Sequence, residues 1–205
     1  MAPFALDLEK TRTKTSLVRI EPAINAFGSM LLVAKQDDEP GIHEWVTKTH
    51  LQMSGEERLR HKLVTIGFHY SIMPQTAGGS FEAYLDALEA TPPSELRERL
   101  LDAYAGICLT KEPPADVNEP VDWNEVLVSA TSYVEFPRNR FGDDLTDEAM
   151  EARAYEYVLE PVALKKLLTG HIRWFWKNHL QAEWNRVRPC SKNLRERSTR
   201  SITAT

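Results

Sequence analysis

The sequence contains little cysteine, little glycine and no long apolar segment. Its 205 residues include two cysteines and nine glycines. Cys108 and Cys190 are too far apart in sequence to form a metal-binding or redox motif, so we expect reduced thiols and a cytoplasmic protein. No apolar run approaches the roughly 20 residues that span a bilayer. Met1–Thr15 also lacks the basic start and apolar block of a signal peptide.

The sequence motifs of common enzyme classes are missing as well. We find no Gly-x-Ser-x-Gly elbow, no phosphate-binding loop and no dinucleotide-binding glycine pattern. Six histidines are present, but none has the His-x-x-x-His spacing of helical zinc ligands. His61 and His69 are eight residues apart, as are His171 and His179, which places neither pair on one tight ligand face. We therefore expect no enzyme activity, no cofactor and no metal.

The overall composition is that of an ordinary soluble globular protein. Hydrophobic residues make up 42% and charged residues 27%. The net charge of -5 argues against a molecule whose whole surface binds nucleic acid. Twelve prolines against nine glycines suggest helices separated by rigid joints. The sequence predicts an all-α fold, a multi-helix bundle around a long, aromatic-rich C-terminal helix.

Apolar residues recur at helical spacing along most of the chain. Ser54-Gly55-Glu56-Glu57 is a capping box, because the side chains of Ser54 and Glu57 can each accept a hydrogen bond from the other's backbone N–H. This helix is expected to reach Met73, with Leu59, Leu63, Ile66 and Tyr70 facing inward. Other helices are predicted to begin at Pro22 and Ile42, after caps at Ser80, Thr91 and Thr146, and at Pro161.

Residues 110–142 are harder to assign. Thr110–Pro120 contains three prolines and is either a linker or a long crossing loop. Trp123–Phe136 has apolar spacing that suits a helix and β-branched content that suits a strand. We favour the helix, because its neighbours are helical and a sheet would have no clear partner strand. Pro137–Gly142 is predicted to be a basic turn.

The last predicted helix runs from Pro161 to Pro189, and its second half holds three of the five tryptophans. Apolar residues and histidines occupy two adjacent faces, so this helix is expected to be central. Its aromatic residues either form core or also line a ligand pocket or a dimer seam. The candidate pocket residues, here and on earlier helices, are Trp45, His69, Tyr70, His171, Trp174, Phe175, His179 and Trp184.

The expected organisation is an N-terminal arm over 1–15, a single helical domain over 16–189 and a disordered tail over 190–205. The tail has almost nothing apolar to bury and is rich in Arg, Lys, Ser and Thr. It is either a solvated segment or a basic arm that touches nucleic acid in a salt-sensitive way.

Three stretches, Gly41–Thr49, Phe81–Tyr104 and His171–Pro189, carry a family resemblance. Their pattern of aromatic and charged residues, with Trp176, Glu183-Trp184 and Arg188-Pro189 in the last stretch, resembles the helical N-terminal region of some bacterial ArsR/SmtB-like transcriptional regulators. The resemblance implies a homodimer, a small-molecule effector and DNA binding through a C-terminal winged helix. The family's metal-binding thiolate motif has no counterpart here.

The resemblance ends at Pro189, because no winged helix follows it in this sequence. A one-base shift of the reading frame at Cys190 permits codons that would extend the helix, so the tail is interpreted as an out-of-frame end. We therefore expect a regulatory domain truncated before its DNA-binding winged helix, which would bind DNA weakly or not at all by itself. The alternatives are a free-standing small-molecule-binding or enzymatic helical bundle with a His/Trp-lined pocket, and a purely structural interaction domain.

Overall fold

The computed structural model describes residues 21–37, 43–75, 79–110, 113, 117 and 119–187. These residues form helices joined by turns and contain no strand, which confirms the predicted all-α fold. The predicted arm over 1–15 and tail over 190–205 lie outside the described residues. Within the described part, no helix is both long and apolar enough to cross a membrane.

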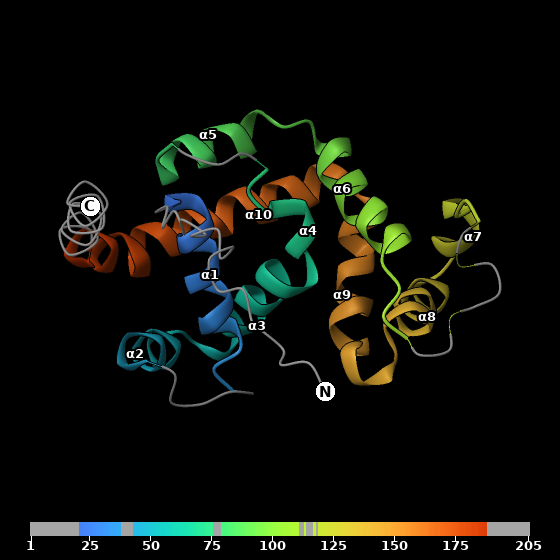
Figure 1. Cartoon of the computed structure of the whole chain (residues 1–205), viewed down its shortest axis with the longest axis horizontal. Helices are drawn as coiled ribbons and strands as arrows, with labels where there is room; N and C mark the ends of the chain where they lie inside the picture. Colours follow the sequence, from blue (N-terminus) through green and yellow to red (C-terminus); the bar gives the residue numbers. More distant parts are fainter. Residues whose placement is uncertain are drawn as a thin grey trace, which may run out of the picture.

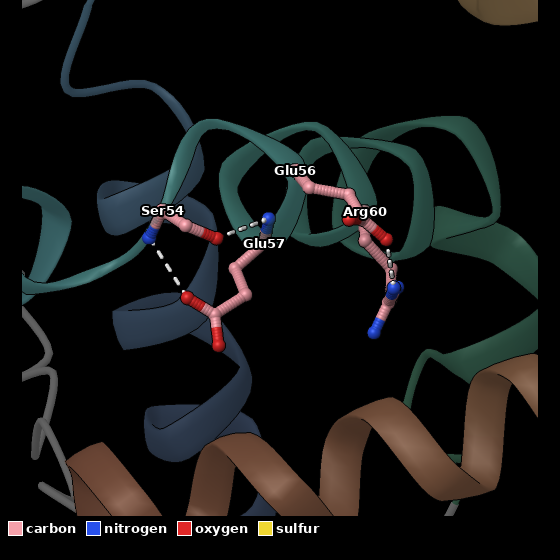
Figure 2. Close-up of polar contacts among 4 residues, drawn as sticks. All are labelled: Ser54, Glu56, Glu57 and Arg60. Atoms are coloured by element: carbon pink, nitrogen blue, oxygen red, sulfur yellow. Dashed lines mark hydrogen bonds and ion pairs between the residues drawn. The ribbon is translucent and has the colours of Figure 1, made fainter.

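The first three helices are α1 (Pro22–Ala34), α2 (Glu44–Gln52) and α3 (Gly55–Lys62). Figure 2 shows the predicted capping box at the start of α3. The Ser54 hydroxyl accepts from the Glu57 backbone N–H at 3.2 Å, and Glu57 Oε2 accepts from the Ser54 N–H at 2.8 Å. Because both free N–H groups are satisfied by neighbouring side chains, this helix start is fixed locally.

The helix predicted to run from α3 to Met73 is interrupted by a π-helical turn, η2 (Leu63–Gly67), followed by α4 (His69–Ile72). The Phe68 N–H donates to the Leu63 carbonyl five residues back, at 3.0 Å. This wider turn rotates the inward face. The expectation that Leu59 faces inward is therefore wrong, since its side chain is 53% exposed. The buried positions on this segment are His61, Leu63, Val64, Thr65, Gly67, Phe68, Ser71 and Ile72.

Helices α5 (Phe81–Ala90) and α6 (Pro93–Gly106) follow. The predicted cap at Ser80 is confirmed, because its hydroxyl accepts from the Ala83 N–H at 3.2 Å. The predicted cap at Thr91 is wrong. Pro92 precedes α6 without a side-chain cap, and the Thr91 hydroxyl instead donates back to the Ala87 carbonyl at 2.9 Å.

The region 123–136 is helical, as favoured, but it forms parts of two helices, α7 (Trp123–Val126) and α8 (Ala130–Phe141). Ser129 separates them by accepting from the Ser132 N–H at 3.1 Å, which begins α8. The predicted basic turn over 137–142 is wrong, because Pro137 lies inside α8. The helix ends at Gly142, whose φ of +89° is readily adopted only by glycine.

A 3-10 turn, η3 (Asp143–Leu145), leads into α9 (Glu148–Leu159). The residue that caps α9 is Asp147, whose carboxylate accepts from the Met150 N–H at 3.0 Å. The predicted cap, Thr146, instead donates its hydroxyl to the Gly142 carbonyl at 2.9 Å.

The last helix comprises α10 (Pro161–Phe175) and a second π-helical turn, η4 (Trp176–Leu180), and it stays helical through 187. In Figure 1 it runs from beside α6 past α4 and α1, whereas α7 and α8 lie beyond its start. It packs against α5, α6, α9 and η2. Its buried residues are Leu164, Leu168, His171, Ile172, Phe175, Trp176 and Leu180. This helix therefore contacts elements from most of the bundle.

Candidate functional site: a buried histidine pair beside a cleft

Two histidines meet where α1, α3 and α10 pack together. The side chains of His61, on α3, and His171, on α10, are 0% and 4% exposed. His61 Nδ1 lies 2.9 Å from His171 Nε2. The other ring nitrogen of His61 lies 2.9 Å from the Met30 carbonyl oxygen of α1. One imidazole thus joins three helices that are remote in sequence.

The partners of His61 fix where its proton lies. The Met30 carbonyl can only accept, so His61 Nε2 carries hydrogen. Burial lowers the pKa of His61 to about 4 and, together with the nearby His61 and Arg60, that of His171 to about 3. Both rings are neutral near pH 7. His61 Nδ1 is therefore an acceptor, and His171 donates to it through Nε2–H.

Aromatic rings pack closely around this pair. The His61 ring stacks on Phe175, with centroids 4.4 Å apart and planes 16° apart. Trp174 contacts the rings of both His171 and His179, at centroid distances of 5.3 and 5.0 Å. These contacts, together with the burial of both imidazoles, make the pair part of the core.

His179 lies at the edge of the same cluster. Its Nδ1 atom is buried and has no hydrogen-bond partner among the described residues. Burial lowers its pKa, and the negative charge of Glu57 opposes that shift. Figure 2 shows Glu57 on the side of α3 that faces the long helix. Glu57 of the capping box therefore also lies close enough to η4 for its charge to affect the pKa of His179.

A cleft of about 290 Å³ lies between α1, α2 and α3. His61 is among the residues around it although its side chain is buried, so the histidine pair lies between the cleft and α10. Its lining combines apolar and cationic side chains. The lining residues are Val33, Ala34, Asp37, His50, Met53, Gly55, Arg58, Leu59, His61 and Lys62.

The polar groups of the cleft are held in place by neighbouring acceptors. His50 Nδ1 lies 3.3 Å from the Val33 carbonyl and its Nε2 lies 3.0 Å from Asp37 Oδ1. Both partners are hydrogen-bond acceptors, and they hold the His50 ring between α1 and the residues that follow it. Arg58 donates to the Met53 carbonyl at 3.1 Å. Within the described part of the chain, no carboxylate is paired with Arg58.

The eight predicted pocket residues divide into separate groups. His171, Trp174, Phe175 and His179 form one cluster of ring contacts. His69 and Tyr70 touch each other elsewhere in the core, against Phe27 and Tyr104 respectively. Trp45 on α2 and Trp184 in the segment after η4 are partly buried against the core. None of the eight lines the cleft.

Sequence reasoning missed the parts of the site that matter most, His61, His50 and Arg58. His61 lies seven residues before Phe68 and eleven before Ile72, a spacing that fits a common helical face with those buried residues. The polar character of His61 and the unforeseen π-helical turn concealed that pattern. No sequence signal identifies His171 as its partner, because the two lie 110 residues apart.

A second buried polar group lies between α6, α8 and α9. The Tyr104 hydroxyl donates to Glu151 Oε1 at 2.9 Å. Burial raises the pKa of Glu151 to about 7, although the phenols of Tyr104 and Tyr133 act to lower it. The Tyr133 hydroxyl lies beside this carboxyl but has no aligned hydrogen bond, and neither does Glu151 Oε2. This carboxyl is therefore incompletely satisfied, and half-protonated near neutral pH.

The described residues contain no group of three or more His, Cys, Asp or Glu side chains placed to hold a metal ion. The chain matches no family model, no curated protein and no solved structure. The distinctive feature of the described structure is a pair of neutral histidines between a partly cationic cleft and the long helix.

Proposed function

We propose that this helical body is the regulatory part of a bacterial transcriptional regulator, combining effector sensing with dimerisation. The observation that carries the proposal is that His61 lines the cleft and also accepts a hydrogen bond from His171 on α10. A ligand that shifts α3 changes this contact and biases the position of the long helix. Such a connection couples an effector site to a distant element.

Binding is favoured over catalysis by the state of the two histidines. Their shared hydrogen bond and the Met30 contact occupy both nitrogens of His61, and Phe175 covers its face. A general base needs a free nitrogen within reach of the substrate. The alternative function is a free-standing small-molecule-binding bundle, which the same cleft would serve.

Dimerisation is proposed through a groove of about 430 Å³ between α6, α7 and the end of α9. Its apolar residues include Trp123, Leu127 and Leu159, and the last of these is 44% exposed. Arg97 lies in the same groove, and its Nε atom is buried without a hydrogen-bond partner in the described structure. The groove residues also include Glu98, Asp102, Leu101 and Asn124.

A second copy of the chain suits this groove because its charges are self-complementary. In a two-fold contact the same surface faces itself, so Arg97 of one copy can meet Glu98 or Asp102 of the other. Apolar groove residues would be covered at the same time.

Light scattering of the full chain tests the dimer. We expect a dimer for the wild type, a monomer for Leu159→Glu and a dimer for the control Leu145→Glu. Leu145 is 64% exposed and lies outside the groove, so its substitution reports a non-specific effect of charge. A monomeric wild type would contradict the regulatory proposal and favour the free-standing binding bundle.

The genomic DNA tests the link to transcription. The proposal predicts that a frame shifted by one base after the Pro189 codon encodes a continued apolar helix and then a winged helix. The present chain should bind duplex DNA only weakly and lose that binding as salt rises, because only its basic residues contact phosphate. Absence of a winged-helix frame, or tight sequence-specific binding by this chain, would contradict the proposal.

A further inference from the structure

We propose that the cleft between α1, α2 and α3 binds a small organic carboxylate with a short apolar body. This inference deepens the proposed function, because it names the chemical class of the effector. It depends on the composition of the cleft wall, on the hydrogen-bonding state of its charged groups and on its size.

The charged groups that the structure describes around the cleft leave a positive excess. Asp37, the acidic residue of the lining, is paired with His50 at 3.0 Å. Lys62 lies 3.3 Å from Asp147, which is outside the lining. Arg58 has no paired carboxylate among the described residues and uses Nη1 for the Met53 carbonyl. A guanidinium has five N–H donors, so most of its donors remain for an anion.

The apolar groups of the cleft require that the anion have an organic body. Val33, Ala34 and Met53 of the lining are buried, so Leu59, which is 53% exposed, is the apolar lining residue that a ligand can cover. A bare inorganic anion would leave this surface without a partner, whereas an alkyl chain would cover it. At about 290 Å³ the cleft is at the small end of ligand sites. A short-chain monocarboxylate matches both its charge and its size.

Ligand occupancy would be felt at the long helix through His61. His61 is among the residues around the cleft, and its buried imidazole contacts His171. Leu59, two residues earlier in the chain, is 53% exposed on the lining, so it offers a site where charge can be changed without disturbing the core.

Isothermal titration calorimetry of the full chain with sodium hexanoate tests the inference. We expect the wild type to bind hexanoate. The affinity of Leu59→Asp should be lower by about tenfold or more, because the new carboxylate repels the ligand. The matched control is Leu51→Asp, at a residue 71% exposed on α2 and outside the cleft, which should bind hexanoate normally. Arg58→Gln should also lose binding, whereas the exposed Arg153→Gln should not.

The inference would be overturned by absence of hexanoate binding to the wild type, by equal hexanoate binding to Leu59→Asp, or by equally tight binding of the uncharged analogue hexanamide. Inorganic phosphate binding as tightly as hexanoate would also overturn it, since the apolar wall would then contribute nothing. A monomeric chain that still binds hexanoate would contradict the regulatory proposal alone, whereas a dimer that does not bind it would contradict the cleft proposal alone.

Discussion

His61 and His171 are 110 residues apart in the chain, yet their imidazole nitrogens lie 2.9 Å apart in its interior. The pair is directional, because the Met30 carbonyl requires hydrogen on His61 Nε2 and leaves Nδ1 to accept from His171. Both rings are nearly inaccessible to water. Loss of this contact would leave polar atoms unpaired in the core and should therefore lower the free energy of unfolding measurably.

We expect the two histidines to be energetically coupled. His61→Ala leaves the Met30 carbonyl and His171 Nε2–H without partners, which should destabilise the fold by several kcal/mol. His171→Ala should also destabilise it, but the double variant should cost less than the sum by about 1–3 kcal/mol. Urea unfolding of the wild type and the three variants measures this coupling. Additive effects would show that the hydrogen bond contributes nothing specific.

Stability should fall on acidification because the buried histidines resist protonation. Their pKa values are lowered from 6.5 to about 4 and about 3. Below pH 6.5 the unfolded chain takes up protons that the folded chain does not, so the free energy of unfolding decreases as pH falls toward those values. Each histidine contributes a slope of about 1.4 kcal/mol per pH unit at most.

Urea unfolding between pH 7 and pH 4.5 measures this acid dependence. His171→Gln should have a shallower slope than the wild type, because it lacks one of the two histidines with lowered pKa values. A slope equal in the wild type and His171→Gln would argue against a neutral, buried pair.

Glu151 should affect stability in the opposite direction. Burial raises its pKa from 4.5 to about 7, so its contribution is fully present below pH 4.5 and is lost as pH rises through about 7. Glu151→Gln retains a group that accepts from Tyr104 and cannot ionise. This variant should therefore lose less stability than the wild type between pH 6 and pH 8.5. Thermal unfolding across that range, with exposed Glu156→Gln on the same helix as control, tests the prediction. Parallel pH profiles for the wild type and Glu151→Gln would contradict it.

The capping box is expected to stabilise the α3 segment that carries His61. Ser54→Ala removes the acceptor for the Glu57 N–H shown in Figure 2 and should cost about 0.5–2 kcal/mol. The exposed Ser94, which follows the first residue of α6, provides the control Ser94→Ala. Chemical denaturation of both variants compares the two sites. If both variants have nearly the same free energy of unfolding as the wild type, the capping box does not stabilise the start of α3.

Helix starts were predictable from the sequence where side chains next to the start determine them. The Ser54 box and the Ser80 cap need only side chains within three residues of the helix start. The start of the last helix at Pro161 follows from proline's fixed φ and missing N–H. The cap was less predictable where two adjacent residues could each serve, since Asp147 rather than Thr146 caps α9.

The central site depends on long-range packing and was not predictable in the same way. The π-helical turn over Leu63–Gly67 shifts the buried face, so Leu59 is exposed and His61 is enclosed. Pro137 lies within α8 although proline usually ends helices. The cleft exists because α1, α2 and α3 meet there, and only the folded chain brings Arg58 and His50 to one wall.

The protonation state of the histidine rings in the folded full chain tests the link between the cleft and the long helix most directly. Long-range proton–nitrogen NMR correlation at pH 7 distinguishes the two neutral tautomers from imidazolium. We expect both His61 and His171 to be neutral, with hydrogen on Nε2 and none on Nδ1, and the His171 signals to shift when hexanoate is added. An imidazolium at either position, or hydrogen on Nδ1 of His61, would contradict the proposed link between the cleft and the long helix.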